Sequence, residues 1–160
     1  MGRSKKKKKN GGSGESSSNE ETAVEGLLTL VAGGGAEEPS KEEAGHIFGE
    51  ALNMINGKEE VMVDLKNTRI GDKRAKSIVK ALEQGAPNLT FLDLSHNTIS
   101  DVQAESLAAV LADGKAPKLS VLNLSANSIS VECRERVMTK LKGRKDLVLE
   151  LNLAEKVLGN

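Results

Sequence analysis

VDLKNTRI at residues 63–70, LDLSHNTI at 92–99 and LNLSANSI at 122–129 are three versions of one octapeptide in a chain of 160 residues. They begin at positions 63, 92 and 122, so the period is 29 to 30 residues. Self-similarity at such a period indicates stacked units, each of which buries its apolar face against the next. A weaker fourth copy is expected from Leu151, where Leu-x-Leu occurs again.

Each unit is expected to run as strand, turn and helix. Alternating Leu-x-Leu residues predict a short strand with its leucines buried. The turn positions Thr68, Asn97 and Asn127 follow, where a buried side chain can bond backbone groups that no strand reaches. Helices are then expected to begin at caps such as Ser100 and Ser130. The predicted fold is a right-handed α/β solenoid, with a parallel sheet on its concave side and helices on its convex side.

Composition divides the chain before the first octapeptide. Residues 1–22 hold a lysine run and a Gly/Ser-rich stretch, which predicts a disordered tail because there is little apolar surface to bury. Residues 23–39 contain an apolar patch and are expected to cap the repeats, as either a short strand or a helical turn. Residues 40–160 are expected to form the repeat domain, whose first helix is predicted over 41–56 from a capping box at 40–43.

The motif Leu-x-Leu-x-x-Asn-x-Ile occurs at 92–99 and again at 122–129. On these residues the chain from about residue 40 to 158 resembles the ribonuclease-inhibitor-like class of leucine-rich repeats, whose units of about 28–29 residues carry a full convex helix. Residues 50–67 are also faintly similar to the short repeat domain of tropomodulins, which cap actin filaments. The resemblance implies a non-catalytic surface that binds other proteins.

If the leucines point inward, the alternate strand residues form rows across the concave face. In the expected register the first row is Met62, Phe91, Val121 and Glu150, and the second is Asp64, Asp93, Asn123 and Asn152. We predict that a partner binds the first three residues of each row, with Phe91 as the anchor. The alternative interpretation is that the apolar residues merely suit strands, or that residues 24–31 fold over them.

The first nine residues carry six positive charges and no negative ones, at Arg3, Lys5, Lys6, Lys7, Lys8 and Lys9. Since the formal net charge of the whole chain is zero, the other residues sum to −6. This head has three interpretations: a solubilising tail, a nucleic-acid or nuclear-targeting contact, and a contact with an anionic surface. No aromatic side chain is interleaved with the lysines, which disfavours base stacking.

No arrangement in the sequence points to catalysis. His46, His96 and Cys133 stand without the spacing of a metal site or of a nucleophile beside its base. We therefore expect no enzyme activity, no cofactor and no metal. The single cysteine and the lack of an apolar leader favour an intracellular location, cytoplasmic or nuclear. No apolar run approaches the roughly 20 residues that span a bilayer.

The leading expectation is a non-catalytic protein-interaction module, either an adaptor or a structural subunit of a larger intracellular assembly. One alternative is a basic-tailed factor associated with nucleic acid, and another is a cytoskeletal protein that binds actin-type filaments. The interaction module and the nucleic-acid factor can be distinguished by testing whether partner binding needs Phe91 or the lysines of residues 3–9.

Overall fold

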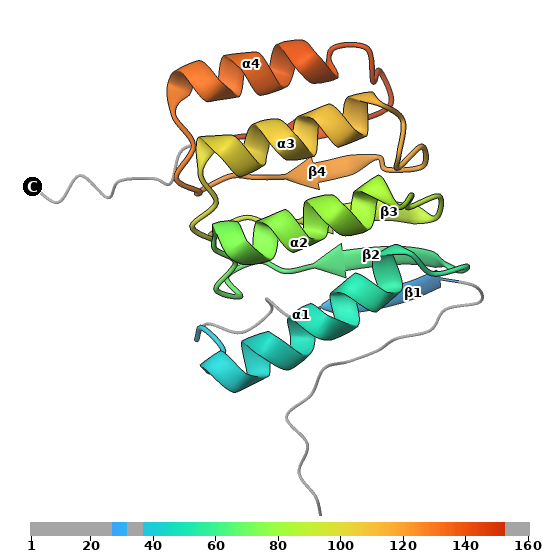
Figure 1. Cartoon of the computed structure of the whole chain (residues 1–160), viewed down its shortest axis with the longest axis vertical. Helices are drawn as coiled ribbons and strands as arrows, with labels where there is room; N and C mark the ends of the chain where they lie inside the picture. The colour runs from blue at the N-terminus through green and yellow to red at the C-terminus, as the bar shows by residue number, and fades with distance from the viewer. Residues whose placement is uncertain (1–26, 32–36, 153–160) are drawn as a thin grey trace, which may run out of the picture.

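The computed structural model describes residues 27–31 and 37–152, which form two layers (Figure 1). One layer consists of the helices α1 (Lys41–Ile55), α2 (Asp72–Glu83), α3 (Asp101–Ala112) and α4 (Val131–Leu141). The other consists of the strands β1 (Leu27–Val31), β2 (Glu60–Asp64), β3 (Leu89–Asp93), β4 (Val121–Asn123) and β5 (Val148–Glu150). The strands form one sheet in chain order, and every pairing is parallel. This arrangement confirms the α/β solenoid.

Residues 27–31 form a strand rather than a helical turn. In β1, Leu30 pairs with Val63 of β2, and its side chain is 3% exposed. Because β1 lies beside β2 at the edge of the sheet, residues 27–31 do not fold over the sheet's face. The tail predicted for residues 1–22, and residues 23–26 and 32–36 of the predicted cap segment, lie outside the described residues.

The inward leucines of successive units share one core. Leu65, Leu94 and Leu124 occupy equivalent places, because the backbone nitrogen of each donates a 2.8 Å hydrogen bond to the next strand. All three side chains are at most 2% exposed, and they belong to one cluster of buried aliphatic residues that includes members from α1 to α4. Burial of this whole cluster supplies most of the favourable free energy of folding, since the hydrophobic effect scales with the apolar area removed from water.

The predicted register of the last strand is wrong by two residues. β4 pairs with β5 as Val121 with Val148 and Asn123 with Glu150. Val148 therefore takes the place expected for Glu150 in the first row. Glu150 takes the place expected for Asn152 in the second row.

A difference in connection length accompanies this shift. Eight residues separate α3 from β4, whereas six separate α4 from β5. The chain alternates Leu149, Leu151 and Leu153, so a slip by two residues keeps the leucines on the same face of the sheet. The sequence pattern is thus compatible with either register.

The first helix begins and ends close to its predicted bounds. Ser40 Oγ accepts a hydrogen bond from the backbone nitrogen of Glu43 at 3.2 Å, and the Glu43 carboxylate accepts one from the Ser40 nitrogen at 2.9 Å. This reciprocal pair satisfies two backbone donors at the helix start and confirms the capping box.

The later helix starts are joined to one another. Ser130 Oγ accepts from the Cys133 nitrogen at 3.2 Å and donates to Asp101 of the preceding helix at 2.6 Å. Ser100 stands at the start of α3, but its hydroxyl makes no bond to its own helix. It donates instead to Asp72 at 2.7 Å, so its role is to link α3 to α2.

Candidate functional site

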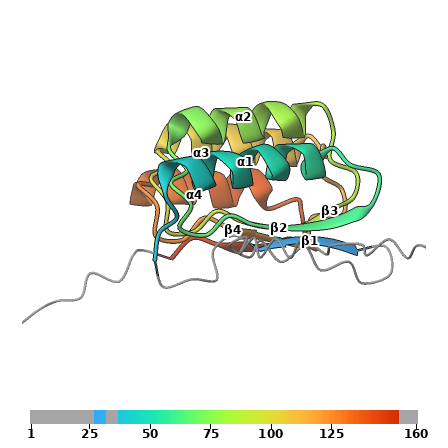
Figure 2. The same ribbon diagram turned by 90° about the horizontal axis from the view of Figure 1, so that it is seen from below.

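The candidate site is the face of the sheet opposite the helices, which we call the open face. Figure 2 shows α1 to α4 together on one side of the strands. No other described helix or strand covers the opposite side. Because side chains alternate along a strand, the residues between the buried leucines lie on the open face.

The first row on this face is apolar. Met62, Phe91 and Val121 are partners across β2, β3 and β4, so the structure brings these three predicted residues together. Each is half-buried rather than fully exposed. Thr29 of β1 extends the row at one end, and Val148 of β5 extends it at the other with 57% exposure. We call Met62, Phe91, Val121 and Val148 the apolar row. Val148 is not among the residues predicted for this row, because the sequence pattern predicts the last strand two residues later.

The second row follows at the carboxyl ends of the strands. Asp64, Asp93, Asn123 and Glu150 are partners across β2 to β5, and we call them the polar row. In the first three, Oδ1 accepts a hydrogen bond from the backbone nitrogen two residues further on, at 2.7 to 3.0 Å. Asp93, predicted as a binding residue, is only 9% exposed and also accepts from Asn123 Nδ2 at 3.2 Å. Its carboxylate is therefore largely occupied within the protein.

The polar row carries negative charge on Asp64, Asp93 and Glu150. Asp64 and Asp93 stand opposite each other on neighbouring strands, an arrangement of like charges that destabilises a sheet. Neither takes part in an ion pair among the described residues. Partial burial raises the pKa of the Asp64 carboxyl, and the nearby Asp93 charge adds to the rise. The row consequently favours a cationic ligand over an anionic one.

The predicted turn residue Asn97 bonds across the boundary between two units. Its Oδ1 accepts from the backbone nitrogens of Thr68 at 3.1 Å and Ile70 at 2.9 Å. Its Nδ2 donates to the carbonyls of Leu65 at 2.9 Å and Leu94 at 3.0 Å. These bonds account for an amide at this position without any ligand.

Asn127 makes the same kind of contact one unit later, accepting from the Ile99 nitrogen at 3.0 Å and donating to the Leu94 carbonyl at 2.9 Å. Thr68 differs, because its hydroxyl donates only to the Leu65 carbonyl of its own unit, at 2.7 Å. In the sequence, no copy of the octapeptide precedes 63–70.

The described histidine and cysteine residues, which are the types most often found in catalytic and metal sites, lie apart from one another. His46 lies exposed on α1 and His96 lies exposed in a turn. Cys133 is fully buried in α4, and burial raises the pKa of its thiol to about 11, so it is a poor nucleophile near neutral pH. Within 27–31 and 37–152, no three side chains of His, Cys, Asp or Glu are grouped to hold a metal ion. The predicted basic-tail residues, 3 and 5–9, lie outside the described residues.

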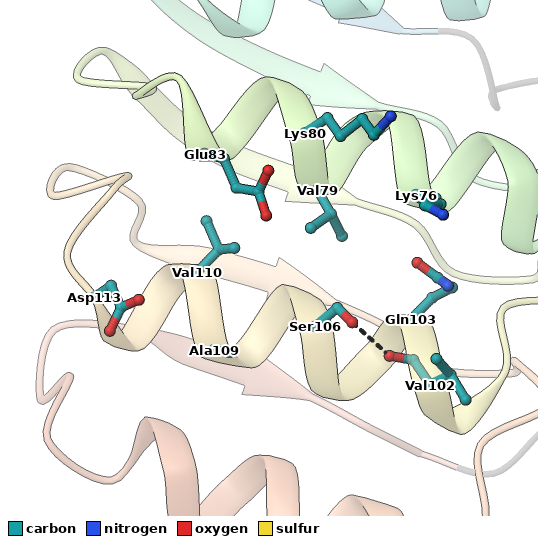
Figure 3. A pocket seen from close by; sticks show the side chains of 10 residues that line it. All are labelled: Lys76, Val79, Lys80, Glu83, Val102, Gln103, Ser106, Ala109, Val110 and Asp113. Atoms are coloured by element: carbon teal, nitrogen blue, oxygen red, sulfur yellow. Dashed lines mark hydrogen bonds between the residues drawn. The ribbon is translucent and has the colours of Figure 1, made fainter.

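A groove of about 530 Å³ lies between α2 and α3, on the helical side of the molecule (Figure 3). Val79 and Val110 face each other from its two walls, and Gln103 points toward Lys76. Ser106 Oγ donates to the Val102 carbonyl within α3, at 2.8 Å. The groove does not bring together a nucleophile and a base, and it is separated from the open face by the thickness of the protein.

Comparison with protein families matches residues 85–108 to a model described as Leucine Rich repeat. This segment is a leucine-rich repeat. It contains β3, the octapeptide at 92–99 and the first part of α3, so the leucine-rich repeat contributes Phe91 and Asp93 to the open face. Comparison with curated protein sequences gave no match. None of the described helices combines the length and the apolar character needed to cross a membrane.

Proposed function

We propose that this chain is a non-catalytic protein-interaction module, an adaptor or structural subunit that binds a protein partner through the open face. The observation that carries the proposal is the apolar row lying directly beside the polar row, on the face that no described helix covers. Apolar residues rimmed by polar ones are typical of interaction surfaces. Leucine-rich repeats also commonly bind proteins, which supports the same conclusion.

The proposal also covers the class of repeat, the domain bounds and the location of the protein. Units of 29 to 30 residues, with helices of 11 to 15 residues, support a member of the ribonuclease-inhibitor-like class. We take residues 1–22 as a basic tail, 23–39 as a cap segment and 40–160 as the repeat domain, in an intracellular protein. The nucleic-acid alternative depends on residues 3–9 alone, and the actin-type alternative on the faint similarity of residues 50–67, so neither displaces the open face as the leading candidate.

The test replaces Phe91, which lies at the centre of the apolar row. Partners are first captured from native lysate with the full-length chain and identified, and each affinity is then measured with purified proteins by calorimetry. Phe91→Ala removes the largest apolar group of the row, and we expect at least a tenfold loss of affinity, because central aromatic residues cost about 2 kcal/mol or more when truncated at an interface. Thermal unfolding should change far less than in Leu94→Ala, since Phe91 is only half-buried.

Val102→Ala is the matched control, because Val102 is an apolar residue on α3, is 68% exposed and lies on the helical side. It should leave the affinity unchanged. A partner that binds Phe91→Ala as tightly as the wild type, or that loses affinity only with Val102→Ala, contradicts the use of the open face.

A further inference from the structure

The open face presents a negatively charged strip in which neither Asp64 nor Asp93 forms an ion pair among the described residues. Asp64, Asp93 and Glu150 lie in one row, with Lys66 as the nearest basic residue in sequence to any of them. The backbone nitrogen of Lys66 donates to Asp64 Oδ1 at 2.9 Å, whereas the Lys66 ammonium affects the pKa of the Asp64 carboxyl less than burial and Asp93 do. Beside this strip, Met62 and Phe91 supply apolar area on which the methylene stem of a lysine can lie.

The same chain contains a segment of complementary charge. Arg3 and Lys5–Lys9 give six positive charges within seven residues, with no acidic residue among them. A lysine ammonium can pair with a carboxylate of the polar row, and its charge is also attracted to the face of an aromatic ring such as Phe91. An extended lysine-rich segment therefore matches both rows of the open face.

The connection has the right length. Seventeen residues, 10–26, join Lys9 to the start of β1, and they are rich in Gly and Ser. A Gly/Ser-rich coil of this length has a root-mean-square span of about 20–25 Å. Asp93 lies two strands away from β1 and near the strand ends, about 16 Å from Leu27 on standard sheet spacings. A tether whose average span matches the distance to its target gives an effective concentration in the millimolar range.

From these observations we infer that residues 3–9 of this chain bind the open face of the same molecule, with lysines over the polar row and against Phe91. This inference rests on the proposed function, because it takes the same face as the binding surface. It adds a regulatory consequence: a partner must displace the tail. Replacing Lys5–Lys9 by Gln therefore raises the affinity for the partner, about twofold if the tail occupies the face half of the time.

The experiment places a nitroxide spin label on Ser4→Cys in the full-length chain and measures the paramagnetic relaxation enhancement of backbone amides by NMR. Labelling near neutral pH is selective, because the native Cys133 is buried, and the unmodified chain is the labelling control. We expect the amides of Met62, Asp64, Phe91 and Asp93 to be enhanced severalfold more than those of α3. The difference should vanish in 1 M salt, where the screening length is only about 3 Å.

The double variant Asp64→Asn, Asp93→Asn should abolish the selective enhancement. Its fold is preserved because Asn123 already fills the equivalent position with the same backbone hydrogen bond. The matched control is Glu83→Gln, Asp113→Asn, which removes two charges beside the groove on the opposite side and should change nothing. Enhancement that is uniform over both faces, or that persists in the first double variant, overturns the inference.

A mixture of isotope-labelled chain without nitroxide and nitroxide-labelled chain without isotope separates binding within one molecule from binding between two. Enhancement of the open-face amides in this mixture assigns the contact to a second copy and overturns binding within one molecule. If the tail shows no contact while Phe91→Ala still loses its partner, the inference fails and the proposed function stands. If the tail contacts the face while Phe91→Ala retains every partner, the proposed function fails instead.

Discussion

Asn97 Oδ1 lies 2.9 Å from the backbone nitrogen of Ile70, a residue of the preceding unit, and accepts its hydrogen bond. The same oxygen accepts from Thr68, and the amide nitrogen of Asn97 donates to Leu65. One side chain thus satisfies three backbone groups of its neighbour. Since stacked units are stabilised mainly by their contacts with neighbours, this residue contributes to the cohesion of the array.

Asn97→Ala should destabilise the protein by about 3 kcal/mol or more, because the buried backbone donors of Thr68 and Ile70 both lose their acceptor. Urea unfolding followed by circular dichroism measures the change. Asn127→Ala is the comparison, and its smaller expected loss follows from the partly exposed position of its bonds. Equal losses for the two variants would argue against burial as the cause.

Leu94→Ala and Leu124→Ala should each cost about 2–5 kcal/mol, since both side chains are buried and leave a cavity when shortened. Thermal unfolding of each variant measures the effect. Val102→Ala, at an exposed site on α3, should stay within about 0.5 kcal/mol of the wild type. A wild-type unfolding temperature for either leucine variant would mean that the shared core is not where the structure places it.

Ala126→Asn should stabilise the protein by about 1 kcal/mol, because Ala126 adopts a φ of 55°, a left-handed conformation that costs L-residues about this much and that asparagine tolerates better. Asn67, at the equivalent position of the first octapeptide, has a φ of 53°. The reciprocal variant Asn67→Ala should therefore lose a similar amount. Chemical denaturation tests both, and a change of the same sign in the two variants contradicts the argument.

Asp64→Asn should stabilise the protein at neutral pH by about 0.2–1 kcal/mol, because it removes one of two like charges on facing strands. Partial burial and Asp93 raise the Asp64 pKa above 3.8, so the folded state binds this proton more tightly than the unfolded state does. The free energy of unfolding of the wild type therefore falls as the pH rises from 3.8 through the raised pKa of Asp64. Below pH 3.8 the Asp64 carboxyl is protonated in both states, so Asp64→Asn is then no more stable than the wild type. Denaturation at a series of pH values measures this, and an advantage that grows in acid would contradict it.

Cys133 should resist alkylation by iodoacetamide at pH 8 and react rapidly after denaturation, since its thiol is buried and its pKa is raised to about 11. The unfolded thiol ionises near pH 9.0 while the folded one stays protonated, so the Cys133 contribution to stability declines as pH rises from 9.0 to about 11. Mass spectrometry follows the alkylation, and comparison with Cys133→Ala isolates the alkaline effect. Fast labelling of the folded chain would place Cys133 at the surface.

The fold could be predicted because the same sequence pattern occurs in several units. Three octapeptides each indicate a strand, and apolar spacing with a capping box indicates the helix that ends at Ile55. The register of β5 was not predictable in the same way, since Leu149, Leu151 and Leu153 offer two equivalent alignments. The bond from Ser100 to Asp72 was missed for a different reason, because a serine before a helix is ordinarily read as a cap for that helix.

Part of the candidate site could be predicted from the sequence, and part of it could not. Alternation along the strands places Met62, Phe91 and Val121 on one face, and this follows from the period of a β-strand alone. The near burial of Asp93 does not, because it depends on Asn123, a residue 30 positions away that approaches only when two strands pair.

The sequence by itself determined the repeating unit, the inward direction of its leucines and the basic character of residues 3–9, since these depend on local pattern and composition. Tertiary structure alone decided the place of β1 in the sheet, the two-residue shift of β5 and the pairing of Asp64 with Asp93 on neighbouring strands. The physical reason is that register and electrostatic neighbourhood arise between segments about 30 residues apart. They are set by loop lengths and by close packing, which no local pattern of the chain encodes.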